Sequence, residues 1–246
     1  MQMIIAPAKK MVVDTEAFLP QSQPAYLPET TALLTYLRAL SPVAAQTMWQ
    51  CSDRLAATAY AQLQALTIAG PLTPAVMSYV GIQYQYMAPG LLTAPGLRYL
   101  QANLRILSAF YGILRPFDGI VPYRLEMKSR VPGLPTPDLY AFWGQRLHDA
   151  LDFRAPVLNL ASKEYAQAIR PYLQPGEQLI DVVFGRLVDG RVKTAATRAK
   201  MARGAMVRYL AEQAVTTLAQ VAEFDAPDYV FAPERSDATR LVFLAR

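Results

Sequence analysis

The sequence predicts an α+β fold: a single compact domain over residues 1–246, with an antiparallel-rich β core wrapped by helices. The first half of the chain contains segments with apolar residues at helical spacing, whereas the second half contains β-rich runs separated by turn residues. Of all residues, 53% are hydrophobic and 17% are charged, which favours a globular protein with a sizeable core. Because no linker divides the chain, we expect one domain.

The first half of the chain is expected to be mainly helical. The apolar run MQMIIAPA predicts a buried strand, and three prolines between Asp14 and Pro28 indicate a loop. Leucines then recur at helical spacing from Leu33 to Leu40, and serines precede the next two apolar segments at N-cap positions. We therefore predict helices over residues 27–40, 41–50, 52–67, 73–87, 94–110 and 138–152.

The second half alternates between strand and helix patterns. The Asp189-Gly190 pair lies between two β-rich runs, which is a strong hairpin signal. The prediction is a strand over 155–162, a helix over 162–173, a hairpin over 179–195, a helix over 197–221 and a C-terminal hairpin over 228–245.

Composition argues against several classes of protein. The N-terminus resembles no signal peptide, and no segment approaches the roughly 18 apolar residues that span a bilayer, so we expect a cytoplasmic protein without a membrane partner. Cys51 is the only cysteine and His148 the only histidine, which excludes an internal disulfide and argues against a Cys/His metal site. We expect Cys51 in the core, His148 on a helix surface, and neither a metal nor a cofactor.

The positive charge of the chain is concentrated in one segment. The net charge is +5, yet residues 186–208 alone contain seven cations and one acid. A second basic segment, residues 98–130, contains six cations and two acids. Local basicity of this kind indicates an anionic partner.

The helix predicted over 197–221 carries the clearest cationic surface. At 3.6 residues per turn, Lys200, Arg203 and Arg208 lie opposite the apolar side, Gly204 lies among them, and Arg198 is in the first turn. A glycine there would let a phosphodiester approach the backbone while the cations contact it. The alternative is a solvated polar face on which Gly204 packs against another element.

Several motifs, in order along the chain, resemble the YaaA family of bacterial peroxide-stress proteins. They are APAK, SDRLA, LRILSAFYGILRPFD, PYRLEM, DLYAFWG, NLASKEY and AKMARGAMVRY, and the similarity extends over essentially the whole chain. The resemblance implies a β-rich core wrapped by helices and a helix-hairpin-helix element at about residues 97–127. It also implies DNA binding in a positively charged cleft, and a role in keeping free iron and oxidative DNA damage low during peroxide stress.

The implied helix-hairpin-helix would bind a phosphate through backbone N–H groups of a glycine-bearing turn. Tyr111 and Gly112 would form that turn, and Arg105, Arg115 and Arg124 would supply charge. Together with Arg198, Lys200, Arg203, Gly204 and Arg208, these residues form the predicted nucleic-acid site. The expected partner is double-stranded or partly unpaired DNA, contacted without sequence preference because no base-reading helix is present.

The chain departs from the pattern of the family that it resembles, so the resemblance is to a divergent member. Ala109 replaces the first glycine of the pattern LSGLYG, and Val80 and Gln83 replace a lysine and an acid. Met201 replaces the second of two lysines. Each change removes polarity or flexibility near the implied cleft.

An enzyme acting on a small anionic or nucleotide-like substrate is the alternative function. Its acid–base candidates are Lys9, Glu126 and Glu164, which together with Lys200 could line one cleft. Some polar residues have structural interpretations instead. Asp138 and Ser162 are placed as helix caps, and Glu126 could pair with Arg124. The aromatic residues are expected to form core or cleft wall, or to stack on unpaired bases.

Overall fold

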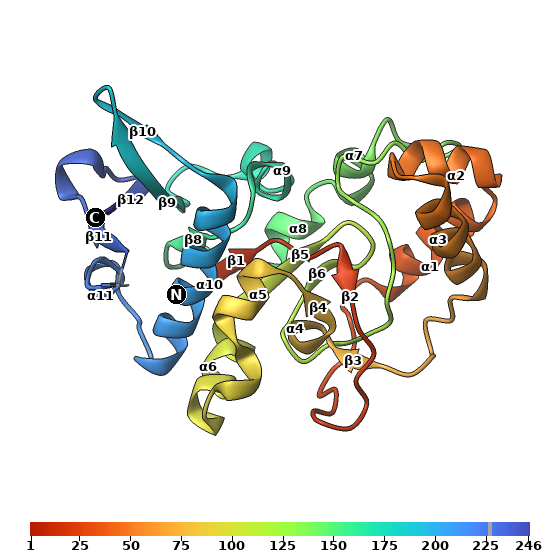
Figure 1. Cartoon of the computed structure of the whole chain (residues 1–246), viewed down its shortest axis with the longest axis horizontal. Coiled ribbons are helices and arrows are strands. Elements are labelled where there is room, and N and C mark those ends of the chain that lie inside the picture. Colours follow the sequence, from red (N-terminus) through yellow and green to blue (C-terminus); the bar gives the residue numbers. More distant parts are fainter. Residues whose placement is uncertain (226–227) are drawn as a thin grey trace.

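The computed structural model describes residues 1–225 and 228–246, and within them an eight-stranded sheet extends from one end of the molecule to its middle (Figure 1). Its strands are β1 (Met3–Ile5), β5 (Leu104–Ser108), β6 (Gly112–Leu114), β8 (Val157–Asn159), β9 (Leu179–Val188), β10 (Arg191–Lys193), β11 (Tyr229–Phe231) and β12 (Arg240–Ala245). Seven of them follow the order β11-β12-β9-β8-β1-β5-β6, and β10 pairs with β9. Strand β1 is therefore an inner strand, with β8 on one side and β5 on the other.

The sheet is mostly parallel, so the predicted antiparallel-rich core is wrong. The inner pairs β12–β9, β9–β8, β8–β1 and β1–β5 are all parallel. The antiparallel pairs are β11–β12, β5–β6 and the β9–β10 hairpin. The inner strands are separated in sequence by helices, and such crossovers join parallel strands. The fold is a single compact α/β domain with a mixed sheet.

Both predicted hairpins are present. Asp189 and Gly190 have φ angles of 52° and 71° and join β9 to β10. The second hairpin pairs β11 with β12, but β12 also lies parallel to β9 on its other side. The local turn chemistry predicted each hairpin, whereas the parallel pairing depends on segments far apart in the chain.

No helix-hairpin-helix forms in the described residues 97–127. Helix α6 (Ala94–Asn103) ends earlier than predicted, and the chain continues as β5, a tight turn and β6. Leu104 and Ile106 pair with Met3 and Ile5 of β1 and are fully buried. Leu97, Leu100, Leu104 and Leu107 recur at helical spacing, but pairing with β1 overrides that pattern, because tertiary burial outweighs local propensity.

Three N-terminal helices lie together at one end of the molecule, as Figure 1 shows. These are α1 (Leu27–Arg38), α2 (Pro42–Trp49) and α3 (Asp53–Ala65), close to the predicted bounds. Ser41 caps α2 by accepting a hydrogen bond from the backbone N–H of Ala44. Leu33 and Leu37 of α1 and Leu63 of α3 are buried in the core.

Helix α10 (Ala196–Glu212) packs against α5 (Ile82–Met87) and against the sheet. Gly204 lies at the α5 contact, where an added Cβ would be 2.1 Å from the backbone oxygen of Gln83. Because only glycine allows this approach, Gly204 determines how α10 packs against α5. The prediction that Gly204 admits a phosphate is wrong, because α5 occupies the space.

The remaining elements are short. They are α4 (Ala75–Ser78), α7 (Leu139–Trp143), α8 (Arg146–Asp149), α9 (Lys163–Ala166), α11 (Leu218–Ala222), β2 (Lys10–Met11), β3 (Thr73–Pro74), β4 (Tyr79–Val80) and β7 (Gly119–Ile120). Strand β2 pairs with β4, and β3 pairs with β7. Among the residues that the structure describes, no helix is long and apolar enough to cross a membrane.

Candidate functional site

A cavity of about 460 Å³ contains five cationic side chains, and we call it the cationic cavity. The cations are Lys9, Lys10, Arg124, Lys200 and Arg203. They come from segments far apart in the chain, and three of them lie outside the segment 186–208 in which the sequence concentrates charge. A volume of this size is in the range of small-molecule sites, and it would also accommodate one repeating unit of a polymeric anion.

The fold positions each of these cations. Lys9 lies between β1 and β2, and Lys10 is the first residue of β2, directly opposite Val80 of β4. Lys200 and Arg203 are three residues apart on α10, hence on one face of that helix. The close contact of Gly204 with α5 fixes that face beside Gln83, which itself lines the cavity.

Two carboxylates share the cavity with the cations. The Nζ atom of Lys9 lies 2.7 Å from Oε1 of Glu126. Oε1 of Glu164 accepts a hydrogen bond of 3.1 Å from the backbone N–H of Lys128. The structure therefore brings Lys9, Glu126, Glu164 and Lys200 into one cavity. The expected pair of Glu126 with Arg124 is not formed, because Glu126 pairs with Lys9 instead.

Two arginines of the cavity have unsatisfied nitrogen atoms. The Nε atoms of Arg124 and Arg203 are buried, and neither has a hydrogen-bond partner among residues 1–225 and 228–246. Burial lowers the pKa of Arg203, and the negative charge of Asp181 opposes that effect. A buried donor without a partner costs about 1–3 kcal/mol, and an arginine donor is suited to an anionic oxygen. These two groups make the cavity a candidate anion site.

Three residues of the predicted nucleic-acid site are structural instead. The side chain of Tyr111 is fully buried, and its hydroxyl accepts a hydrogen bond of 3.1 Å from the backbone N–H of Val121. Gly112 has a φ of 77°, and a Cβ there would be 2.8 Å from the Trp143 ring. Gly204 is buried against α5. The roles predicted for these residues are wrong, because packing makes them inaccessible to a ligand.

The other predicted arginines lie outside the cationic cavity. Arg105 donates hydrogen bonds to backbone carbonyls. Burial lowers the pKa of Arg105, and the nearby positive charge of Arg115 lowers it further. Arg115 is exposed and lies near Asp118. Arg208 pairs with Glu212 at 2.8 Å, and Arg198 is exposed near Tyr229. The structure does not gather these four into one group with Arg124, Lys200 and Arg203.

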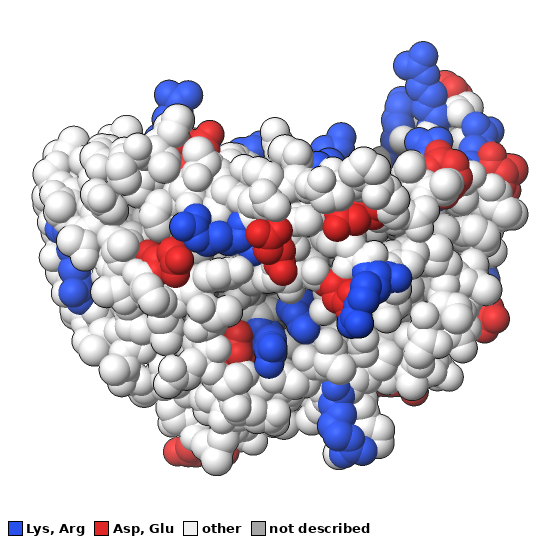
Figure 2. All heavy atoms as spheres, turned by 180° about the vertical axis from the view of Figure 1, so that it is seen from behind, with Lys and Arg blue, Asp and Glu red and all other residues white. Residues whose placement is uncertain are grey.

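Charge on the back of the molecule is mixed. Figure 2 shows lysines and arginines interspersed with acidic residues over a largely uncharged surface. The β9–β10 hairpin projects from the body in Figure 1 and carries Arg186, Arg191 and Lys193, of which Lys193 lies 3.7 Å from Asp189. The seven cations predicted as one cluster are therefore divided between this hairpin and α10.

Most aromatic residues form core or cavity wall, as expected. Tyr79, Tyr84 and Trp143 are buried, whereas Tyr86 is 44% exposed. The hydroxyl of Tyr123 lies 2.8 Å from that of Tyr79 and 2.7 Å from that of Ser108. This buried chain of hydroxyl groups holds the ring of Tyr123 in the cavity wall.

The structure corrects two further predictions about single residues. His148 is 6% exposed, not on a helix surface, and is held between Asp149 and Glu177 at 2.9 and 2.7 Å. Cys51 is only half-buried at the edge of the core. Among the described residues, no group of three or more His, Cys, Asp or Glu side chains is arranged to hold a metal ion.

Of the two predicted helix caps, one is formed as expected. Asp138 accepts a hydrogen bond from the backbone N–H of Ala141 at 2.8 Å, which confirms its role at the start of α7. Ser162 occupies the N-cap of α9, but its side chain makes no capping hydrogen bond.

Sequence reasoning missed Lys10 and the residues of α3 that line a second cavity beside the first. That cavity includes Thr58 and Gln62, which are four residues apart on α3 and therefore on one helix face. Their shared face was the available signal, since both are polar residues on the side of α3 that also carries the buried Ala59 and Leu63.

Comparison with known proteins agrees with the motifs. The family model described as "Peroxide stress protein YaaA" matches residues 1–235. The chain belongs to the YaaA family. A UPF0246 protein of Lactiplantibacillus plantarum is 55% identical over 245 residues, covering 99% of both chains. UPF0246 proteins of Lacticaseibacillus casei and Lachnoclostridium phytofermentans are 52% and 45% identical to this chain. The alignments cover 100% and 96% of those two proteins, respectively.

Proposed function

We propose that this YaaA-family protein binds the phosphate groups of DNA in the cationic cavity. The observation that carries the proposal is the convergence of five cations on one cavity, with the buried Nε atoms of Arg124 and Arg203 unpaired within the described residues. A phosphate oxygen would supply the missing acceptors, because charged acceptors form the strongest hydrogen bonds with arginine. The expected ligand is duplex DNA that is distorted or partly unpaired. A displaced single strand can enter a recessed cavity more easily than a regular double helix can.

The cellular role proposed with this activity is protection during peroxide stress. Family membership supports a role in the peroxide response. We propose that binding to exposed DNA limits oxidative damage and that the protein also helps to keep free iron low. Comparing DNA lesions and free iron after peroxide treatment, in cells with and without the gene, tests both parts separately. Equal lesions in the two strains would contradict the protective role.

Fluorescence anisotropy with a labelled duplex containing an unpaired bubble tests DNA binding. The logarithm of the association constant should fall linearly with the logarithm of the salt concentration. The slope of this line is proportional to the number of phosphates that the protein neutralises. A triple variant, Lys9→Ala/Lys10→Ala/Lys200→Ala, should lose about one unit of slope for each phosphate contact removed. All three lysines line the cavity.

A matched control removes the same charge elsewhere. Lys193→Ala/Arg198→Ala/Arg208→Ala takes three cations from the β9–β10 hairpin and from α10, and none of the three lines the cavity. This variant should retain most of the parent slope. If the two triple variants lose equal slope, binding depends on overall charge and the cavity is not the DNA site.

An enzyme acting on a small nucleotide-like anion is the second candidate function. The Lys9–Glu126 pair and Glu164, all in the cationic cavity, favour it, because acid–base chemistry needs such groups beside the bound substrate. Incubation with nucleoside mono-, di- and triphosphates, followed by phosphorus NMR, would detect turnover. Turnover by the parent that is lost in Glu164→Gln would support this candidate, and no turnover of any of these compounds would contradict it.

A further inference from the structure

A second cavity of about 330 Å³ adjoins the cationic cavity and differs from it in chemistry. We call it the apolar cavity, because its walls include Leu37, Trp49, Leu55, Leu63, Leu66 and Phe110. The two cavities share five lining residues, namely Lys9, Lys10, Tyr123, Arg124 and Leu125. The shared residues place cations at the boundary between an apolar space and an anion-binding space.

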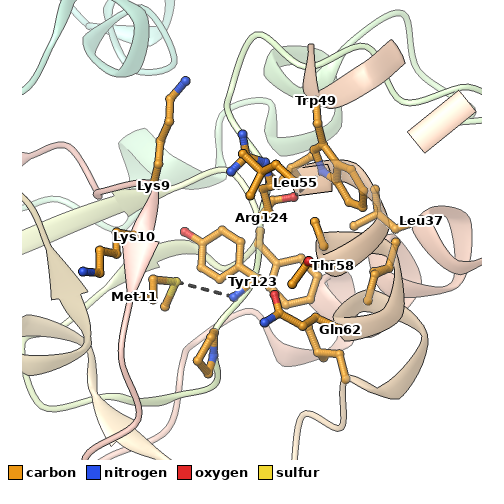
Figure 3. A pocket seen from close by; sticks show the side chains of 16 residues that line it. Lys9, Lys10, Met11, Leu37, Trp49, Leu55, Thr58, Gln62, Tyr123 and Arg124 are labelled. Carbon is orange, nitrogen blue, oxygen red and sulfur yellow. Dashed lines mark hydrogen bonds between the residues drawn. The ribbon is translucent and has the colours of Figure 1, made fainter. Parts of the chain in front are cut away.

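The walls of the apolar cavity come from elements on opposite sides of the cavity. Figure 3 shows Lys10 and Met11 of β2 on one side and Leu37 and Trp49 on the other. The ring of Tyr123 lies between them and stacks on Phe110, with centroids 5.0 Å apart and an interplanar angle of 27°. Aromatic rings and leucine side chains thus form a wall suited to a flat apolar group.

Arg124 links the two cavities. The indole N–H of Trp49 donates a hydrogen bond of 2.8 Å to the backbone oxygen of Arg124, so the apolar wall is tied to this residue. The Nε atom of Arg124 is buried and has no partner within residues 1–225 and 228–246. In Figure 3 the side chains of Arg124 and Lys9 extend in the same direction, away from Gln62. An anionic group bound between Arg124 and Lys9 would therefore lie at one end of the apolar cavity.

The opposite end of the apolar cavity is polar but uncharged. Thr58 and Gln62 line it from α3, and both are exposed. The Gln62 amide can donate and accept hydrogen bonds, which is what the edge of a nucleobase requires. An acyl chain would gain nothing from such groups, so they distinguish a base from an aliphatic tail.

We propose that the apolar cavity receives the base of an unpaired nucleotide whose phosphate binds at Arg124 in the cationic cavity. The base would lie against Tyr123 and the leucines, with its polar edge toward Gln62 and Thr58. The positive charge at one end matches the phosphate of a nucleotide, the apolar wall matches the face of its base, and the neutral polar end matches the edge of that base. The proposal rests on the proposed function in that both place a phosphate in the cationic cavity, but its test uses no DNA.

The test compares adenosine 5′-monophosphate with ribose 5-phosphate by isothermal titration calorimetry. Both carry the same phosphate and sugar, and only the first carries a base. Adenosine monophosphate should bind about ten-fold or more tightly, since burial of a base against aromatic groups is worth roughly this factor. Lys200→Ala should weaken the binding of both ligands, because it removes a positive charge from the cavity that binds their common phosphate.

Two filling variants remove the space for the base. Thr58→Phe and Gln62→Phe each place a ring in the apolar cavity from exposed positions on α3. In either variant the two ligands should bind with equal affinity. The matched control is Ala57→Phe, on the same helix and exposed but outside the cavity, which should keep the full preference.

The base site would be overturned by equal affinity of the two ligands for the parent, by a preference that survives both filling variants, or by binding of neither ligand at millimolar concentration. Tighter binding of octanoate than of adenosine monophosphate would also overturn it. If the nucleotide preference is found but bubble DNA does not bind, the base site stands and the DNA proposal fails. If bubble DNA binds but the two small ligands bind equally, the DNA proposal stands and the base site fails.

Discussion

Gly204 of α10 and Gln83 of α5 meet backbone to backbone, so closely that a Cβ on Gly204 would lie 2.1 Å from the Gln83 oxygen. We predict that Gly204→Ala destabilises the protein by about 1–3 kcal/mol or more, because the two helices must separate. Urea unfolding monitored by circular dichroism measures this loss. Because Gln83, Lys200 and Arg203 line one cavity, phosphate binding should weaken in the same variant.

A glycine in another helix provides the control. Gly96 lies in α6, and a Cβ there would meet its nearest neighbour, Leu92, at an ordinary 3.5 Å. Gly96→Ala should leave stability unchanged or raise it by up to about 1 kcal/mol, since alanine favours a helix more than glycine does. Equal destabilisation by the two substitutions would contradict the role given to Gly204.

Tyr111 is predicted to affect stability and not DNA binding. Tyr111→Phe removes the acceptor of the buried Val121 N–H, which should cost about 1–3 kcal/mol. The folded variant should bind bubble DNA as tightly as the parent, because Tyr111 is fully buried. Thermal unfolding and anisotropy measure the two quantities. A loss of affinity without a loss of stability would restore Tyr111 to the DNA site.

Glu126 is predicted to weaken phosphate binding in the parent. Its carboxylate pairs with Lys9 at 2.7 Å and adds negative charge to the cationic cavity. Glu126→Gln should therefore raise the affinity for DNA by about two- to five-fold, the effect of an exposed ion pair of less than 1 kcal/mol. Glu212→Gln, which releases Arg208 outside the cavity, should have a smaller effect. An equal gain in both variants would point to net charge alone.

His148 is predicted to make stability depend on pH. Burial alone would lower its pKa, but hydrogen bonds and charge from Glu177 and Asp149 outweigh burial, so the pKa lies above the usual 6.5. Because the folded pKa is raised, this stabilisation is complete below the unfolded pKa and is lost as the pH rises through the folded pKa. Toward acid, it is also lost as Glu177 and Asp149 become protonated, since both carboxyl groups have lowered pKa values.

The variant His148→Phe isolates this effect. It keeps a ring beside Phe153, whose centroid is 5.0 Å from that of His148, but cannot gain a proton. At about pH 6 it should be less stable than the parent by about 1–3 kcal/mol, the value of hydrogen bonds to charged groups. Guanidinium unfolding across the neutral range should show this difference shrinking as the pH rises. A constant difference would mean that His148 contributes packing alone.

The fold could be predicted from the sequence where local chemistry decides it. The Asp189-Gly190 turn and the helices around Leu33 and Leu63 follow from turn propensity and apolar spacing, and they are present. The pairing of β1 with β5 could not be predicted, because Leu100, Leu104 and Leu107 recur at helical spacing and so favoured a helix through this segment. Only the strand β1, far away in the chain, makes the extended form of this segment more stable.

The candidate site was predicted in part for a similar reason. Lys9, Arg124, Lys200 and Arg203 stand out as cations, and the structure places them in one cavity. Helical spacing also suggested an open face at Gly204, but it carries no information about α5, which covers that face. Thr58 and Gln62 share the face of α3 that carries Ala59 and Leu63, but helical spacing does not reveal which elements pack opposite that face to form the cavity.

The position of β1 within the sheet has a consequence for folding kinetics. Met3 pairs with both Leu104 and Leu158, so a strand near the N-terminus finds its two neighbours only after much of the chain has been synthesised. Contacts of such long sequence separation slow folding, because the intervening loops must close before pairing stabilises them. Until then MII remains an apolar segment with unpaired backbone groups, and exposure of this kind favours aggregation of a nascent chain.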